Sequence, residues 1–127
     1  MDVEAMRYLT TLDADTLAPL IPHLLTWIQD INWPVASPVI HLLRKYPFVI
    51  VEPVRKVLRD EAGEKDDGGW KFNCLNYLVV EMNPEYQILL NEEIVRMATS
   101  PTKEEAEWET VEIAKDILRK LHLAVQK

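Results

Sequence analysis

Residues 30–39 read DINWPVASPV, with a tryptophan and two prolines in a chain that otherwise favours helix. Asp30 and Trp33 of this stretch have counterparts further along the chain. Asp67 and Trp70 repeat their spacing, and the apolar positions around them follow the same displacement. Similarity at a fixed period is typical of stacked supersecondary units, none of which can bury its apolar face alone. The stretch is therefore expected to form a corner between two such units.

The repeat and the apolar periodicity predict an all-α protein, with a single domain over residues 1–127. Three antiparallel helix pairs plus a C-terminal helix are expected to stack as a short α–α superhelix. The expected repeat units and terminal helix span residues 3–29, 30–60, 67–98 and 103–123. Within the units, helices are expected near residues 3–12, 15–29, 34–46, 48–60 and 70–82, and after Asn83.

Capping residues and prolines indicate where these helices begin. Asp67 is expected to cap the helix that follows it, and Thr102 forms a capping box with Glu105. Pro38 should bend its helix or delay the start of that helix, because proline has no amide hydrogen to donate. The β-branched run FVIVEPV at 48–54 could be a short buried strand, but its repeat partner has a helical pattern and favours helix.

Two sets of motifs resemble known families. The segment PLIPHLLTWIQDINWPV, residues 19–35, resembles the HEAT-repeat pattern of an apolar helix followed by aspartate and then valine. Ala36 stands where HEAT units usually carry arginine, so this resemblance implies HEAT-like architecture without the usual Asp–Arg ladder. The motifs D-x-N-W-P-V-A-x-P-V at 30–39 and W-K-x-x-C-L at 70–75 are together similar to a small bacterial family, domain of unknown function 5071. That resemblance implies an all-helical HEAT-like domain and supplies no activity, substrate or catalytic residue.

Charge and apolar runs limit the classes of partner. The chain has 127 residues and a net charge of -7, with 21 acidic and 14 basic side chains. Such a chain repels phosphate backbones, so nucleic acid is disfavoured and a basic protein partner is favoured. Only Arg55, Lys56 and Arg59 could form a local basic stripe. The sequence has no apolar run of membrane-span length and no signal-peptide core at its N-terminus. We therefore expect a cytoplasmic protein without a membrane partner, as a monomer or weak dimer.

No set of side chains points to catalysis, a metal or a cofactor. The three histidines do not pair with one another or with carboxylates at metal-binding spacing. The single cysteine, Cys74, excludes an internal disulfide and a multi-cysteine zinc site. Cys74 is expected to be a buried apolar residue, with a reactive thiol as the alternative. The acidic runs that contain Asp66 and Glu105 lack the spacing of a calcium loop and are expected to be solvated surface.

Trp33 and Trp70 are the most suggestive pair, because equivalent residues in stacked units project from the same edge. They are expected to be either core between units or an aromatic anchor for a partner. Asp30, Asp67 and Lys71 stand beside them and could form a polar rim, or could cap and pair locally. The candidate partner-binding set is therefore Asp30, Trp33, Asp67, Trp70 and Lys71.

The function expected from the sequence is that of a non-enzymatic protein–protein interaction module. An acidic protein of this size also fits an immunity-like or antitoxin-like role, in which it binds a basic toxin. The alternative is a small-molecule binding protein or an enzyme that uses a groove between helices near Trp70 and Cys74. No cofactor is expected.

Overall fold

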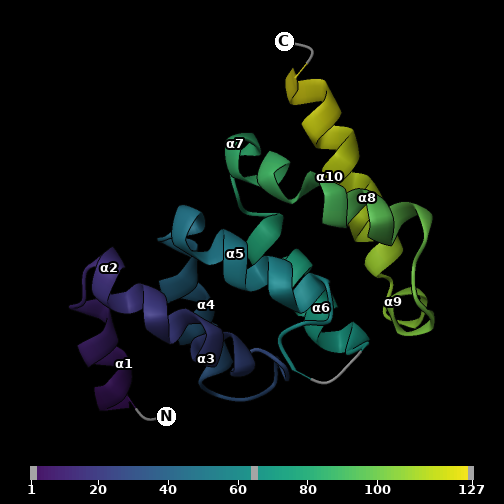
Figure 1. Ribbon diagram of the computed structural model, residues 1–127. Helices are drawn as coiled ribbons and strands as arrows, with labels where there is room; N and C mark the ends of the chain where they lie inside the picture. The colour runs from purple at the N-terminus through teal and green to yellow at the C-terminus, as the bar shows by residue number, and fades with distance from the viewer. Residues whose placement is uncertain (1–2, 64–65, 126–127) are drawn as a thin grey trace.

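The computed structural model describes residues 3–63 and 66–125, and the regular secondary structure in these residues is all helical (Figure 1). The all-α prediction is confirmed. The elements in chain order are α1 (Val3–Thr10), α2 (Ala14–Leu17), η1 (Ala18–Leu20), α3 (Ile21–Thr26), α4 (Ala36–Arg44), α5 (Pro47–Leu58), α6 (Gly68–Cys74), η2 (Leu75–Val79), α7 (Pro84–Gln87), η3 (Ile88–Leu90), α8 (Asn91–Thr99), α9 (Lys103–Glu107) and α10 (Thr110–Val125). Of the η elements, η1 and η3 are 3₁₀ turns and η2 is a π-helix.

The helices alternate between two layers (Figure 1). The first layer contains α1, α4, α6 with η2, and α9 with α10, and each of these contacts the next. The second layer contains α2–η1–α3, then α5, then α7–η3–α8, again with each segment against the next. Contacts of α5 with α4 and α6, and of α8 with α10, join the layers. The finer description of this stack as a HEAT-like superhelix stays a prediction.

Two of the second-layer segments are interrupted by one turn of 3₁₀ helix, where the sequence predicts continuous helices. The segment expected at 15–29 begins at Ala14, because the Asp13 carboxylate accepts a hydrogen bond from the Thr16 amide at 2.8 Å. Pro22 has no amide hydrogen to donate back along the chain, which suits a change of helix type at η1. The helix ends at Thr26, so the residues between it and α4 form turns.

The other helix starts follow the capping signals. Helix α4 begins at Ala36 and not near residue 34, which places Pro38 in its first turn and confirms the delayed start. Asp67 caps α6 by accepting the Trp70 amide at 2.9 Å, and the Thr102–Glu105 capping box is present at α9. The run at 48–54 is helical and lies within α5, so the strand alternative is wrong.

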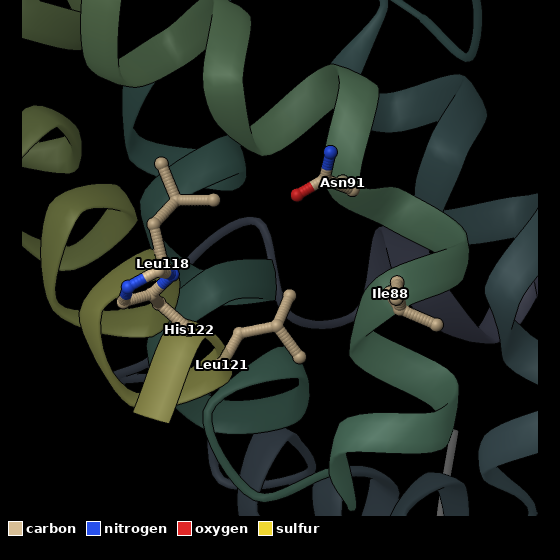
Figure 2. Close-up of a pocket in the computed structure, with 5 residues that line it drawn as sticks. All are labelled: Ile88, Asn91, Leu118, Leu121 and His122. Atoms are coloured by element: carbon tan, nitrogen blue, oxygen red, sulfur yellow. The ribbon is translucent and has the colours of Figure 1, made fainter. Parts of the chain in front are cut away.

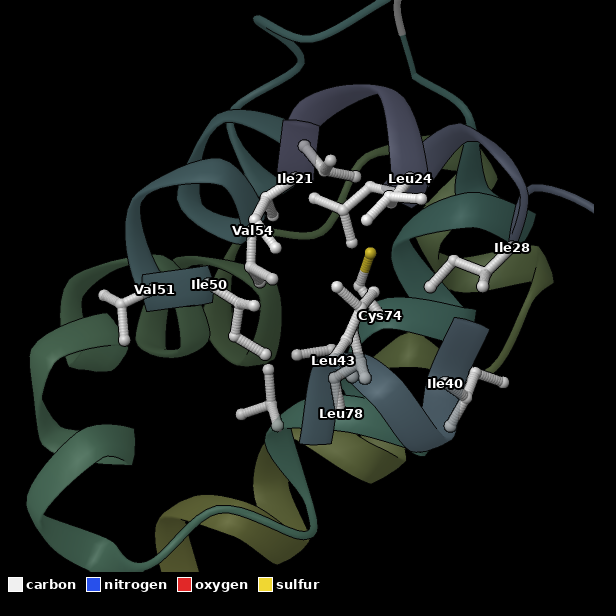
Figure 3. Packing of buried hydrophobic residues seen from close by; sticks show 14 of the residues in the cluster. Ile21, Leu24, Ile28, Ile40, Leu43, Ile50, Val51, Val54, Cys74 and Leu78 are labelled. Carbon is white, nitrogen blue, oxygen red and sulfur yellow. The ribbon is translucent and has the colours of Figure 1, made fainter. Parts of the chain in front are cut away.

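The core lies between the layers, and Figure 3 shows side chains from both layers converging around Cys74. Burying one leucine or isoleucine side chain contributes about 1.5–3 kcal/mol, so this cluster contributes strongly to the stability of the two packed layers. The apolar partners labelled there come from α3, the turn after it, α4, α5 and the π-helix: Ile21, Leu24, Ile28, Ile40, Leu43, Ile50, Val51, Val54 and Leu78.

The helix predicted at 103–123 is divided in two. Helix α9 ends at Glu107, and Glu109 then adopts a left-handed backbone with φ of 61° before α10 begins. The break lets Trp108 lie against the start of α6, where a Cβ added to Gly68 would stand 2.7 Å from Trp108 Cδ1 and 2.5 Å from the Glu104 carbonyl oxygen. Glycine at position 68 therefore permits the close approach of α9 to α6.

Candidate functional site

Two of the five predicted partner-binding residues are interior. Trp70 is 3% exposed, and its indole N–H donates a hydrogen bond of 2.9 Å to the Leu25 carbonyl oxygen. Lys71 is fully buried. A partner contacts only exposed side chains. Because Trp70 and Lys71 are buried, neither is accessible to a partner in this structure. Trp70 has the core role that the sequence left open, and Asp67 acts as the cap of α6.

The other two predicted residues lie on the turns between α3 and α4. Trp33 is 41% exposed and packs edge-on against Trp27, with ring centroids 6.0 Å apart. Asp30 is exposed, and its carboxylate accepts the Asn32 amide at 2.9 Å. Trp33 is thus in a turn and Trp70 in a helix, so the two tryptophans are not structural equivalents. The structure does not gather the five residues on one surface, and binding by Asp30 and Trp33 stays a prediction.

Lys71 is instead the centre of an ion cluster that joins α6 to α9. Its Nζ lies 2.9 Å from Asp60, 3.0 Å from Asp66 and 2.8 Å from Glu105. Glu105 is also fully buried and holds the guanidinium of Arg96, with a shortest distance of 2.6 Å. Buried charges persist only when they are paired and hydrogen-bonded, and here each buried charge has its counterparts.

The cluster favours the charged forms of Lys71 and Glu105. Burial alone would lower the pKa of Lys71, but hydrogen bonds to Glu105, Asp60 and Asp66 outweigh it and raise that pKa. Burial alone would raise the pKa of Glu105, but hydrogen bonds from Arg96, Lys71 and the Thr102 amide lower it below its usual value. The ion pairs of this cluster therefore link α6 to α9, and each buried charge in it has an opposite charge beside it.

This cluster corrects the expectation that the acidic runs around Asp66 and Glu105 are solvated surface. Glu105 is fully buried, and Asp66 accepts hydrogen bonds from Lys71 and from the Thr102 hydroxyl. Both Asp60 and Asp66 have left-handed backbone, with φ of 61° and 57°. The groups of His, Cys, Asp and Glu in the described part of the chain include none that could hold a metal ion.

Cys74 is completely buried among the apolar side chains shown in Figure 3. Burial disfavours the thiolate and raises the pKa of Cys74 well above its ordinary value, and the charge of Asp67 adds to the shift. A nucleophilic thiol requires the opposite environment, so the buried structural role is the one that fits. Trp70 and Cys74 are both buried, so neither side chain is accessible to a ligand at the surface, and the small-molecule or enzyme alternative stays a prediction.

A surface groove large enough for a ligand runs across the second layer, away from Trp70 and Cys74. We call it the Phe48 groove; its volume is about 420 Å³. Phe48 is 74% exposed at the start of α5, and Leu89 of η3 is 46% exposed. The lining residues come from α2, η1, α5 and η3: Ala14, Asp15, Ala18, Phe48, Val49, Val51, Glu52, Arg55 and Leu89. An apolar floor with charged side chains at its edge is the usual composition of a protein interface.

Phe48 was not among the predicted site residues, because the FVIVEPV run was considered only as a choice between strand and helix. The helical spacing contains the missing signal. Val51 and Val54 are buried, whereas Phe48, Glu52 and Arg55 follow one another at intervals of one turn along the adjoining, more exposed side of the helix. A large aromatic residue in line with two charged residues is a better indication of surface than of core.

The candidate basic stripe on α5 is neutralised by α8. Glu93 is 4% exposed and accepts hydrogen bonds from Arg55 at 3.2 Å and from Arg59 at 2.8 Å. The hydrogen bond with Glu93 raises the pKa of Arg59. Arg55 also donates to Glu52 and to the Leu89 carbonyl oxygen. These guanidinium groups join α5 to the η3–α8 segment.

The comparisons with known proteins agree with the resemblance seen in the motifs. The chain belongs to the family described as Domain of unknown function (DUF5071), whose model matches residues 1–118. A comparison with curated proteins found no match. Among the described residues, no helix combines the length and apolar character needed to cross a membrane.

Proposed function

We propose that this protein is a non-enzymatic protein–protein interaction module that holds its partner in the Phe48 groove. The observation that carries the proposal is the exposure of Phe48, which is 74% accessible beside an apolar groove of about 420 Å³. Leaving a phenylalanine in water has a cost that burial against a partner recovers, and aromatic anchors in pockets dominate the binding energy of many interfaces.

The partner that fits this groove is a basic protein that presents an apolar side chain. Asp15 and Glu52 are exposed carboxylates at the edge of the groove, and Asp15 makes no ion pair with a described residue. Arg55, the cation that lines the groove, is already bound to Glu93 and Glu52. The net charge of -7 attracts a basic partner over a longer range and increases its association rate.

The specific form of this proposal is an immunity-like or antitoxin-like protein that binds a basic toxin in the bacterial cytoplasm. In this form the protein acts as a monomer or weak dimer until it meets the toxin. The supporting observations are its small size, its acidic charge and the apolar groove with an acidic edge.

The test compares capture by three forms of the tagged protein from a lysate of the source cells. Wild-type protein, Phe48→Glu and Tyr8→Glu are incubated in parallel at about 50 and 200 mM salt, and bound proteins are identified by mass spectrometry. Tyr8 is the matched control, because it is a 65% exposed aromatic on α1 outside the groove. We expect one basic protein to bind wild type and Tyr8→Glu, more weakly at the higher salt, and not to bind Phe48→Glu. A partner that binds Phe48→Glu equally well would refute the groove as its site.

A further inference from the structure

Each second-layer segment after the first fills a groove between the preceding second-layer segment and a first-layer helix. Helix α5 contacts both α3 and α4. In the same way α7 contacts α5, and the Gln87 side-chain amide of α7 donates a hydrogen bond of 2.9 Å to the Val79 carbonyl oxygen of η2. The stack therefore offers a new groove for a helix each time a first-layer helix is added.

The last first-layer helix, α10, creates such a groove together with η3 and α8, and this groove is open (Figure 2). Its volume is about 370 Å³. Ile88 lines it from one side at 50% exposure, and the C-terminal part of α10 lines it from the other. Its lining residues are Ile88, Asn91, Leu118, Leu121 and His122, and we call it the α10 groove.

The charges around the α10 groove differ from those of the protein as a whole. No acidic side chain of the described residues appears among those that line it. Glu92 and Glu93 of α8 are directed away from it, because both carboxylates lie near Arg59 of α5, at 3.7 and 2.8 Å. On α10 the exposed Lys115 precedes Leu118 by one helical turn, on the same face.

We propose that the α10 groove binds an amphipathic helix of a partner protein, in the position that a further second-layer helix would occupy. The apolar stripe of that helix packs on Ile88 and Leu118, and an acidic residue at its edge pairs with Lys115. This is helix-in-groove recognition, in which apolar side chains one turn apart anchor the peptide. The site is separate from the Phe48 groove: the consecutive residues Ile88 and Leu89 line the two different grooves.

The test is a selection from a displayed library of helical peptides against the full-length protein. The library fixes leucine at one-turn intervals and allows Glu, Lys or Gln at the edge positions. We expect enrichment of peptides with Glu at the edge. The enriched peptide, synthesised with a fluorescein label, is then titrated by fluorescence anisotropy. Ile88→Glu should weaken its Kd about tenfold or more, and Lys115→Glu about threefold.

Two variants on the same helix are matched controls, because Leu123 is 56% exposed and Lys120 is exposed, and neither lines the groove. Leu123→Glu and Lys120→Glu should leave the Kd unchanged. Circular dichroism of every variant reports whether helicity is intact. The proposal is overturned if no peptide is enriched, if lysine is enriched at the edge, or if Ile88→Glu binds as tightly as wild type. A dimer in sedimentation equilibrium that Ile88→Glu dissociates would assign the groove to a second copy of the chain and would also overturn it.

Discussion

Replacing Lys71 by methionine tests whether the ion cluster holds the C-terminal helices on the rest of the stack. Methionine keeps most of the volume of the side chain and removes its charge, so the change isolates the electrostatic part of the cluster. The carboxylates of Asp60, Asp66 and Glu105 then lose the ammonium group that lies within 3.0 Å of each.

The exposure of the three carboxylates sets the size of the effect. Removing one partner of a buried ion pair costs about 3–5 kcal/mol, because the remaining charge is left without compensation. The side chains of Asp60 and Asp66 are 26% and 32% exposed, so water stabilises them when Lys71 is absent. Glu105 is fully buried but keeps Arg96. We therefore expect a loss at the lower end, about 3 kcal/mol, a large part of the 5–15 kcal/mol typical of a domain.

Urea unfolding followed by circular dichroism measures this loss. With an m value of about 1.5–2 kcal/mol/M, the midpoint of Lys71→Met should fall by about 1.5–2 M. Lys120→Met is the control, because Lys120 is exposed on α10, and its midpoint should change by less than about 0.3 M. A loss below about 1 kcal/mol for Lys71→Met would show that the cluster does not stabilise the fold as its geometry implies.

Three further predictions concern stability. Gly68→Ala should destabilise the protein by about 1–3 kcal/mol, because its Cβ would lie 2.5 Å from the Glu104 carbonyl oxygen; an unchanged melting temperature in calorimetry would contradict this. Trp70→Ala should cost about 3–5 kcal/mol and Trp33→Ala clearly less, since their exposures are 3% and 41%; equal losses in urea would contradict the argument from burial. Because the pKa of Glu105 is lowered from 4.5 in the folded state, its contribution is present above pH 4.5 and lost as the pH falls through the folded pKa. Urea midpoints that do not decrease on acidification below that pH would disprove it.

Local signals in the sequence were sufficient to predict the class of the fold and most helix starts. Asp67, Thr102 and the prolines act within one turn of their own position, so their effects can be read without knowledge of the rest of the chain. The interruptions at η1, at η3 and at Trp108 and Glu109 were not predicted, because apolar periodicity continues through them.

The candidate site was harder to predict, because it depends on contacts between segments that are distant in the sequence. Lys71 and Glu105 are each unremarkable charged residues on their own helices, and their burial follows only from the packing of α9 on α6. The sequence repeat predicts that Trp33 and Trp70 occupy equivalent positions, which is wrong, because the first lies in the turns between α3 and α4 and the second in a helix. Phe48 was not predicted as a site residue, although the helical spacing places it outside the core.

The ion cluster also has a consequence for the order in which the protein folds during synthesis. Lys71 leaves the ribosome before Glu105 and before α9, which packs on α6. Since domains begin to fold while synthesis continues, α3, α4, α5 and α6 can assemble around Cys74 first, with Lys71 still hydrated at the growing edge. A charged lysine at that edge keeps water on an incomplete stack and opposes its premature association with other nascent chains. The arrival of α9 then removes the water from Lys71, and α10 completes the stack.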